Sequence, residues 1–313
     1  MTAYQMNIAA VTLAVIALCF AAIAAAVKFG AASAAQASPQ PGFVMTSRIP
    51  LVMYSTGPYE KPADIPPSLQ EARRSWTAHG PVGLRQEWAN DKDARAFIAL
   101  HFPQYLPEFD VLLPGAYRAD VWRLLVVYKL GGIYVDCGVH FKGDPTSIRR
   151  FWSQLGQADM MFLDDDYDFP GAVFQGVLAA VAGHPLVEAA IAQVIDNIRA
   201  RMHGSSCLAI TGPRAVGRAL MAAIPPAAQR HMRKGNWIPG LYTHAQHAIP
   251  LPMGTLLVLR QKKWVITGTD GKPILLTKTP EYYRVVYGAR RMARYPFAWK
   301  ERKVYADWKK KAQ

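Results

Sequence analysis

Tyr117 to Val139 reads YRADVWRLLVVYKLGGIYVDCGV, and this stretch decides the fold of the chain. Residues 116–130 lack Gly and Pro, and their apolar side chains cover most of a helical circumference, which predicts a largely buried helix. Residues 131–132 are both glycine and end that helix, because glycine accepts the positive φ of a helix C-cap. Residues 133–135 then predict a short buried strand, with Asp136 at its C-terminal end.

Two ionisable residues lie within the predicted helix. Asp120 and Arg123 are three positions apart, so they share one face near the helix start. A buried carboxylate and guanidinium must either pair or face a polar cavity, because unpaired buried charge is costly. In open α/β sheets, ligands bind at the C-terminal edge of the strands, where Asp136 is predicted. The alternatives are a structural ion pair, with Asp136 merely opening a loop, or a polar ligand site.

The order of these residues resembles a known family. A-D-x-x-R, followed by Y-x-L-G-G-I-Y-x-D ending at Asp136, is similar to the donor-binding segment of the DXD-containing sugar transferases of glycosyltransferase family thirty-two. That family includes initiating α-1,6-mannosyltransferases, α-1,4-galactosyltransferases and capsular-polysaccharide enzymes. Further landmarks extend the resemblance over residues 48–305, and they are Ile49-Pro50, Trp88-Ala89-Asn90-Asp91, Gly183-His184-Pro185, Thr211-Gly212-Pro213, and Arg294-Tyr295 with Trp299.

The resemblance implies an A-type glycosyltransferase fold, an α/β domain in which a nucleotide sugar lies across the C-terminal edge of a mixed central sheet. It implies that Asp120, Arg123 and Asp136 are catalytic, and that they bind the donor together with Tyr134 and Trp299. The expected activity is retaining transfer of a hexose from a UDP- or GDP-hexose to a glycan, glycolipid or glycoprotein hydroxyl, in polysaccharide biosynthesis or glycosylation. The alternative is a catalytically inactive, carbohydrate-binding accessory protein with the same fold.

The chain departs from the family at the metal-binding motif. Where the family has Asp-x-Asp, this chain has Asp136-Cys137-Gly138, so Asp136 is the carboxylate that remains to bind Mn²⁺ or Mg²⁺. Cys137 is a poor substitute, because a thiolate suits softer metals and the next residue of a strand points to the other face. An acidic run, Asp164-Asp165-Asp166-Tyr167-Asp168, follows an apolar segment at another predicted strand end. This run is either a solvated loop or the source of a further cation ligand.

The whole chain has 313 residues, 51% of them hydrophobic, which is enough for one catalytic domain with a large core. We expect, in order, a short tail at 1–6, a transmembrane signal anchor at 7–28, a stem at 29–47, the catalytic domain at 48–305 and a basic tail at 306–313. The anchor contains twenty consecutive residues with almost no polar member, long enough to cross a bilayer, and a cleaved signal peptide is the alternative. A single-pass membrane location follows, in the secretory pathway of a eukaryotic or viral host or in a bacterial envelope.

The formal net charge of +14 is spread over dispersed clusters without a recognisable nucleic-acid module, so we expect no nucleic-acid partner. The basic C-terminal segment is a solvated face, a contact with anionic lipid headgroups, or an attractor of the donor diphosphate. Cys137 and Cys207 are expected as free thiols, with a disulfide between them as the alternative. His184, Trp76 and Trp88 are predicted to be packing residues.

Overall fold

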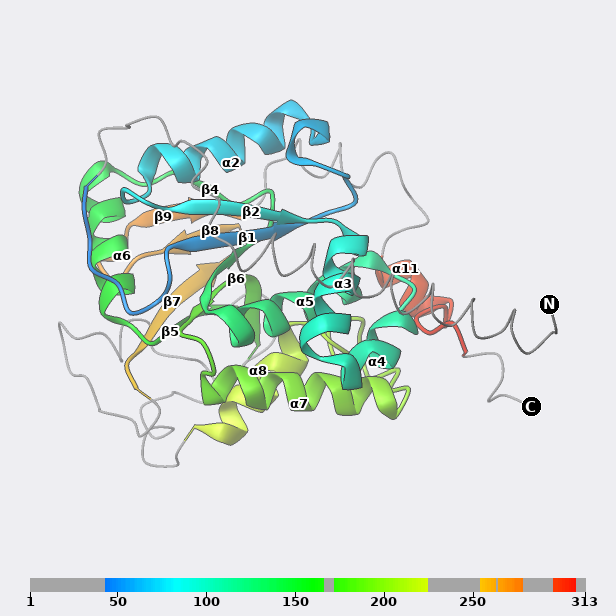
Figure 1. Ribbon diagram of the computed structural model, residues 1–313. Coiled ribbons are helices and arrows are strands. Elements are labelled where there is room, and N and C mark those ends of the chain that lie inside the picture. The colour runs from blue at the N-terminus through cyan, green and yellow to red at the C-terminus, as the bar shows by residue number, and fades with distance from the viewer. Residues whose placement is uncertain (1–42, 166–171, 225–253, 263, 278–294, 308–313) are drawn as a thin grey trace.

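The computed structural model describes residues 43–165, 172–224, 254–262, 264–277 and 295–307. These residues form a nine-stranded mixed sheet with helices on both of its faces (Figure 1). The predicted anchor at 7–28 and most of the predicted stem lie outside the described residues. Within the described ranges, no helix is long and apolar enough to span a bilayer.

The strands are β1 (Val52–Thr56), β2 (Arg85–Ala89), β3 (Gly132–Val135), β4 (His140–Phe141), β5 (Met160–Asp165), β6 (Val173–Ala180), β7 (Leu256–Lys262), β8 (Val265–Thr267) and β9 (Pro273–Leu276). The helices are η1 (Pro62–Asp64), α2 (Pro67–His79), α3 (Asp91–His101), η2 (Pro103–Tyr105), α4 (Leu106–Asp110), α5 (Gly115–Leu130), α6 (Pro145–Gln157), α7 (Pro185–Arg199), α8 (Pro213–Ala223) and α11 (Tyr295–Lys300). The predicted helix and strand of the opening stretch are therefore confirmed to within one residue, as α5 and β3.

The order of the strands in the sheet is β2-β1-β3-β6-β5-β7-β8-β9-β4. Strands β1, β2 and β3 are parallel, and so are β5 and β7, whereas β6 runs antiparallel between β3 and β5. The mixed sheet predicted from the sequence is confirmed. Because β6 separates β3 from β5 and opposes both, the C-terminal ends of β3 and β5 lie at the same edge of the sheet.

The turn between α5 and β3 requires both of its glycines. Gly131 and Gly132 have φ values of 66° and 115°, a region that other residues rarely adopt. A Cβ atom on Gly131 would lie 2.9 Å from the backbone nitrogen of Ala182, and one on Gly132 would lie 2.8 Å from the carbonyl oxygen of Val52. The glycines thus let α5 return directly into the sheet, which places Asp136 beside the start of the helix.

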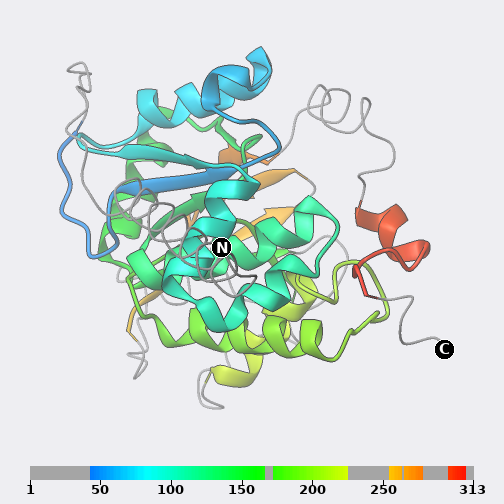
Figure 2. The ribbon, with the colours of Figure 1, turned by 45° about the vertical axis from the view of Figure 1, so that its right-hand side comes forward.

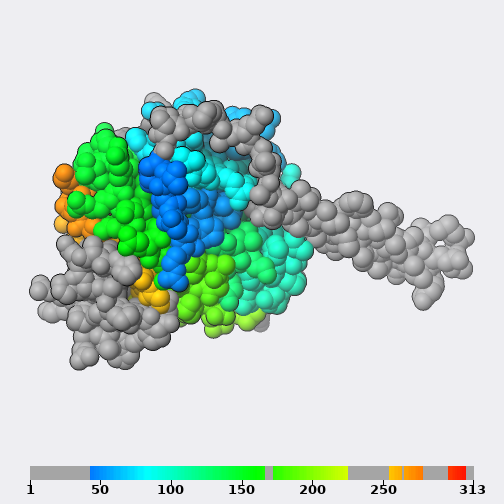
Figure 3. Space-filling model, turned by 60° about the vertical axis from the view of Figure 1, so that its left-hand side comes forward, coloured from blue at the N-terminus to red at the C-terminus, as the bar shows by residue number. Residues whose placement is uncertain are grey.

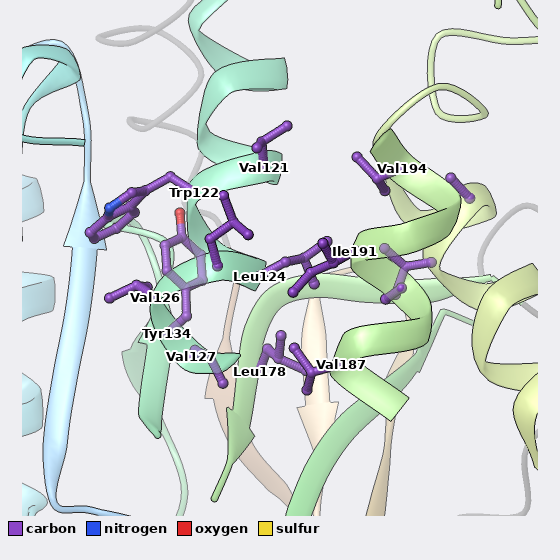
Figure 4. Packing of buried hydrophobic residues seen from close by; sticks show 14 of the residues in the cluster. Val121, Trp122, Leu124, Val126, Val127, Tyr134, Leu178, Val187, Ile191 and Val194 are labelled. Atoms are coloured by element: carbon purple, nitrogen blue, oxygen red, sulfur yellow. The ribbon is translucent and has the colours of Figure 1, made fainter. Parts of the chain in front are cut away.

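One face of the sheet packs against α3, α5, α7 and α8 around the larger hydrophobic cluster. Figure 4 shows its centre, where side chains of α5, β3, β6 and α7 meet, and the labelled residues are Val121, Trp122, Leu124, Val126, Val127, Tyr134, Leu178, Val187, Ile191 and Val194. Helix α5 is buried around most of its circumference, as the apolar pattern predicts. The helix is therefore held rigidly against the sheet.

The opposite face packs against α2 and α6. Trp76 of α2 lies 4.7 Å from the ring of Phe141 and 6.0 Å from that of Trp152, measured between centroids. Residues 43–48 pack beside the end of α6, and Figure 3 shows this N-terminal part of the described chain in blue next to the green helix. Trp76 and Trp88 are 0% and 4% exposed, which confirms the prediction that both are packing residues.

The C-terminal described segment, 295–307, packs beside the start of α5. Tyr305 forms a β-bridge with Leu112, and the backbone nitrogen of Leu113 donates to the carbonyl oxygen of Val304 at 2.9 Å. Figures 1 and 2 show α11, in red, at this side of the molecule. The segment thus joins the loop that precedes α5, although residues 115–294 separate the two in the sequence.

Candidate functional site

The Arg123 guanidinium lies between two carboxylates. Its Nη2 atom is 3.2 Å from Oδ1 of Asp120 and 3.4 Å from Oδ1 of Asp136. Helix α5 supplies the first carboxylate and the guanidinium, and the residue after β3 supplies the second carboxylate. The three side chains named from the sequence therefore meet at the C-terminal edge of β3.

Three further contacts fix the guanidinium. Its Nη1 atom donates to the carbonyl oxygen of Gln175 at 2.8 Å, and its Nε atom donates to that of Ala119 at 3.2 Å. The guanidinium carbon lies 4.5 Å from the ring centroid of Tyr134, a cation–π distance. The Tyr134 hydroxyl in turn donates to Oδ1 of Asp136 at 2.8 Å. Tyr134 therefore supports Arg123 with its ring and Asp136 with its hydroxyl.

The Asp120 carboxylate is buried, and burial raises its pKa to about 6 from an ordinary value of 3.8. The positive charge of Arg123 and a hydrogen bond from Thr211 act in the opposite direction and favour the ionised form. That hydrogen bond runs from Oγ1 of Thr211 to Oδ2 of Asp120 and measures 2.7 Å. Each oxygen of the carboxylate thus has its own polar partner.

Asp136 is the most exposed of the three side chains. Its side chain is 31% exposed, compared with 12% for Asp120 and 7% for Arg123. Its backbone nitrogen donates to the carbonyl oxygen of Gly176 in β6 at 2.7 Å. A Cβ atom at position 176 would lie 2.7 Å from Oδ2 of Asp136, so the absence of a side chain there leaves room for the carboxylate. Asp136 is therefore the member of the group of three that solvent reaches most easily.

Sequence reasoning missed three residues of this group, which are Gln175, Gly176 and Thr211. Gln175 and Gly176 interrupt the otherwise apolar strand VFQGVLAA, and that interruption was the available signal. Thr211 belongs to the Thr-Gly-Pro landmark that precedes α8, but nothing in the landmark shows that its hydroxyl reaches Asp120. Contacts between α5, β6 and the start of α8 depend on how the chain folds back on itself.

Trp299 lies on α11, where its ring stacks on His203 with 4.6 Å between centroids and its Nε1 atom donates to the carbonyl oxygen of His203 at 2.7 Å. The link from this helix to the site runs through Tyr295, whose ring is 5.9 Å from that of Tyr117. Tyr117 is one turn before Asp120 on α5. The donor-binding role of Trp299 stays a prediction.

Cys137 points away from the group of three and packs against Ile65, Leu69 and Trp88. Burial raises the pKa of its thiol to about 12, which keeps the sulfur protonated and unsuited to metal binding. Within the described ranges, no group of three or more His, Cys, Asp or Glu residues is arranged to hold a metal ion.

The interpretation of the acidic run as a solvated loop is wrong for its first member. Asp164 lies within β5 and is 1% exposed, because the strand continues through Asp165. Strand alternation puts Asp164 on the same face as Phe162, which belongs to the α5 side of the sheet. Its neighbour in register on β7 is Arg260. The run's later members, Asp166 and Asp168, lie outside the described residues.

The predictions for His184 and for the two described cysteines are confirmed. His184 is 2% exposed and caps α7, where its Nδ1 atom accepts from the backbone nitrogen of Leu186 at 3.3 Å. Cys137 and Cys207 form no disulfide, as expected for free thiols.

The elements that build the site match known proteins. Residues 66–154 match the family model described as "Glycosyltransferase sugar-binding region containing DXD motif". This part of the chain is thus similar to a glycosyltransferase sugar-binding region. The matched span runs from the start of α2 into α6 and contains Asp120, Arg123 and Asp136. The resemblance to DXD glycosyltransferases is thus supported, whereas the assignment to family thirty-two stays a prediction.

Two curated proteins are similar to about half of this chain. Inositol phosphoceramide mannosyltransferase 3 of Schizosaccharomyces pombe is 27% identical over 155 residues, which are 49% of this chain and 38% of that protein. Inositol phosphoceramide mannosyltransferase 2 of the same organism is 27% identical over 151 residues, which are 48% of this chain and 40% of that protein. The match thus spans about two fifths of the length of these relatives. Among solved structures, PaToxG Glycosyltransferase aligns with 70% of this chain and 80% of its own, with 15% identity and a TM-score of 0.39.

Proposed function

We propose that this protein is a retaining hexosyltransferase that moves a sugar from a nucleoside-diphosphate donor to a hydroxyl acceptor, and that its domain is an A-type glycosyltransferase fold. The observation that carries the proposal is the meeting of Asp120, Arg123 and Asp136 at the C-terminal edge of β3. This group lies within the span that matches a sugar-binding region. Two carboxylates that share one guanidinium offer both acceptors and donors to the hydroxyls of a sugar.

Each residue has a role that follows from its position. Asp120 and Arg123 bind the hydroxyls of the donor sugar, while Asp136, the most exposed of the three side chains, binds the nucleotide side. Tyr134 is buried and supports Asp136 through its hydroxyl. In the transfer, the bond from the anomeric carbon to the diphosphate oxygen breaks, and a bond from that carbon to the acceptor oxygen forms. The acceptor proton passes to the departing diphosphate, so no protein base is needed. The carboxylates stabilise the positive charge that develops on the sugar ring.

A divalent cation fits this site only in part. Asp120 and Asp136 carry two negative charges against the single positive charge of Arg123, so a nucleoside diphosphate meets a net negative group. Asp136 would hold Mn²⁺ or Mg²⁺ together with diphosphate oxygens and water, which suits a cation that keeps several waters. When bound, the cation would offset the charge of the leaving diphosphate. Asp164, buried at the end of β5, is the candidate for a second carboxylate.

The role of Asp164 is open to a direct test. We expect Asp164→Asn to weaken the stimulation of donor hydrolysis by Mn²⁺. Unchanged stimulation in Asp164→Asn, Asp165→Asn and Asp166→Asn would remove the acidic run from the cation site.

The names of the two curated relatives suggest where to start with substrates. Both are mannosyltransferases that act on inositol phosphoceramide. A mannose donor and a lipid acceptor that carries inositol phosphate are therefore the first pair to test, before galactose, glucose and N-acetylglucosamine donors. A lipid acceptor also agrees with the predicted anchor and single-pass membrane location.

The proposal is tested by a donor screen on the full-length protein, with and without Mn²⁺, followed by Asp120→Asn and Asp136→Asn. Each substitution keeps the shape of the side chain but removes its charge, and we expect transfer to fall by roughly 10² or more. Asp110→Asn is the matched control, because Asp110 pairs with Arg95 at 2.7 Å on the exposed surface. Full transfer in either site variant would contradict the assignment.

One observation favours a second candidate, an inactive carbohydrate-binding accessory protein. Gly138 occupies the position of the second motif carboxylate and supplies no ligand. Calorimetry separates the candidates: binding of a nucleotide sugar with slow hydrolysis supports the enzyme, and binding without turnover at any metal concentration supports the accessory protein.

A further inference from the structure

Asp120 and three residues around it form a closed circuit of polar contacts. Arg123 pairs with one oxygen of Asp120 and donates to the carbonyl oxygen of Gln175. The amide nitrogen of the Gln175 side chain donates to the carbonyl oxygen of Thr211 at 3.2 Å, and the hydroxyl of Thr211 donates to the other oxygen of Asp120 at 2.7 Å. The circuit joins α5, β6 and the residue two positions before α8.

Thr211 supplies the hydroxyl of this circuit, which donates directly to Asp120. The residue is 0% exposed, so water cannot replace its hydroxyl as a hydrogen-bond donor. A hydroxyl has one hydrogen to donate, and at 2.7 Å the Thr211 hydrogen is directed to Asp120 Oδ2. A hydrogen bond to an ionised carboxylate is about twice as strong as a neutral one. The contact thus favours the ionised carboxylate and fixes its rotation.

We propose that Thr211 is a positioning residue that keeps Asp120 ionised and correctly oriented at neutral pH. The proposal deepens the proposed function, because it concerns the carboxylate that would bind the donor sugar. Thr211 itself contacts neither donor nor acceptor in this scheme. Its backbone carbonyl is held by Gln175, which ties the threonine to the same strand that holds Arg123.

The charged and titratable groups that face Asp120 come from α5 and from the residue after β3. Arg123 on α5 favours the ionised form, while Asp136 after β3 opposes it. Tyr117, on α5 one turn earlier, is buried and stays protonated because burial raises its pKa well above the ordinary value. Burial of Asp120 itself is the largest influence and favours the protonated form. With the carboxylate so close to protonation at neutral pH, loss of one hydrogen bond changes its ionisation measurably.

The test measures the pKa of Asp120 directly, by ¹³C NMR of the side-chain carboxyl groups, with the Asp120 signal assigned by its absence in Asp120→Asn. Thr211→Val removes the hydroxyl and keeps the shape, and we expect the pKa of Asp120 to rise by about one pH unit. Thr211→Ser keeps the hydroxyl and should leave the pKa within a few tenths of the wild-type value. Thr211→Ala repeats the loss of the hydroxyl without a branched side chain, should the valine variant fold poorly.

Thr277→Val is the matched control for the loss of a buried hydroxyl. Thr277 is 2% exposed, and its Oγ1 atom has no hydrogen-bond partner among the described residues. This variant should leave the pKa of Asp120 unchanged. An equal rise in both valine variants would point to a general effect of lost hydroxyls on the fold and would overturn the proposal. So would an unchanged pKa in Thr211→Val and Thr211→Ala.

The second readout is the pH profile of kcat/KM for sugar transfer. In Thr211→Val the acid limb should move upward by the same amount as the pKa of Asp120, while Thr211→Ser follows the wild type. A raised pKa in a protein that transfers no sugar would leave Thr211 as a positioning residue and refute the proposed function. If Thr211→Val transfers sugar and the acid limb of its pH profile does not move, the proposed function is supported and the positioning role of Thr211 is refuted.

Discussion

At the scale of single residues, the site depends on one guanidinium shared by two carboxylates of unequal burial. Asp120 lies deep beside Arg123, while Asp136 lies at the opening. Burial changes the chemistry of Asp120, because it raises the pKa of this carboxylate to about 6. A carboxylate that protonates so near neutral pH makes the site sensitive to mild acid.

We predict that kcat/KM for transfer falls as the pH drops through about 6, by about tenfold for each pH unit below it. The reason is that Asp120 takes up a proton there and loses its attraction for the developing positive charge. The measurement is a pH profile under conditions where donor is limiting.

Unfolding would not explain this loss. Because the pKa of Asp120 is raised in the folded protein, the folded state binds a proton between about 6 and 3.8 that the unfolded chain has released. Protonation of Asp120 therefore stabilises the folded protein as the pH falls through this range. A circular-dichroism melt at pH 5 is the control, and an acid limb absent from a folded protein would contradict the prediction.

Gly176 gives a second prediction at this scale. A Cβ atom there would lie 2.7 Å from Oδ2 of Asp136 and 2.5 Å from the ring of Phe174. We expect Gly176→Ala to displace the Asp136 carboxylate and to weaken donor binding by roughly tenfold or more. Calorimetry with the nucleotide sugar measures the loss.

Gly115→Ala is the control for this variant, because a Cβ atom at Gly115 meets nothing within 4 Å. Gly115 is the first residue of α5, so the control also tests the helix that carries Asp120. Equal donor affinity in both alanine variants would show that Asp136 does not need the space beside β6.

At the scale of elements, the site is held from both faces of the sheet. Helix α5 places Asp120 and Arg123 on one face of the sheet, while α2, on the other face, contacts the loop that follows Asp136. The contact from α2 is a hydrogen bond from Nε1 of Trp76 to the carbonyl oxygen of Val139, at 2.9 Å. The orientation of Asp136 therefore depends on a helix that contributes no side chain to the group of three.

We predict that Trp76→Phe lowers donor affinity as well as stability. The variant loses the bond to Val139 and part of a buried ring, which should reduce the free energy of unfolding by roughly 1–3 kcal/mol. Chemical denaturation and donor titration measure the two effects.

Trp152→Phe is the matched control, because Trp152 is also 0% exposed and its Nε1 atom donates to the carbonyl oxygen of His79 at 2.7 Å. This variant should lose a similar amount of stability and keep its donor affinity. An equal loss of donor affinity in both variants would indicate a general loss of stability. It would refute a specific role of Trp76 in orienting Asp136.

At the scale of the whole molecule, the chain returns its C-terminal segment to the start of α5. Tyr305 is 2% exposed and its hydroxyl donates to the carbonyl oxygen of Met202 at 2.8 Å, while Arg201 pairs with Asp307 at 2.7 Å. These contacts place α11 beside the helix that carries Asp120. The segment that carries Trp299 is thereby brought to the start of α5.

We predict that Trp299→Ala weakens donor binding by roughly tenfold, because Trp299 packs against the larger hydrophobic cluster from the same helix whose Tyr295 contacts Tyr117 of α5. Phe297→Ala on the same helix is the control, since Phe297 is 46% exposed. The measurement is the donor affinity of both variants, obtained by titration with the nucleotide sugar. Unchanged affinity in Trp299→Ala would remove Trp299 from the donor site and leave it a packing residue that stacks on His203.

The sequence by itself determined α5, β3 and the turn between them, because these depend on local physics. A run of apolar residues without Gly or Pro forms a buried helix, and two glycines accept the φ values that the turn demands. The order of residues along the chain also brings Asp120, Arg123 and Asp136 close together. Strand β3 follows α5 directly and runs back along it, so the end of the strand lies near the start of the helix.

Only the tertiary structure decided what surrounds these three side chains. Gln175, Gly176 and Thr211 reach the site because β6 lies beside β3 and because α8 starts next to α5, contacts that no local pattern encodes. The burial of Asp164 follows in the same way from the pairing of β5 with β6 and β7. Burial and hydrogen bonding at long sequence separation set the charge state of Asp120, so its chemistry is a property of the folded chain.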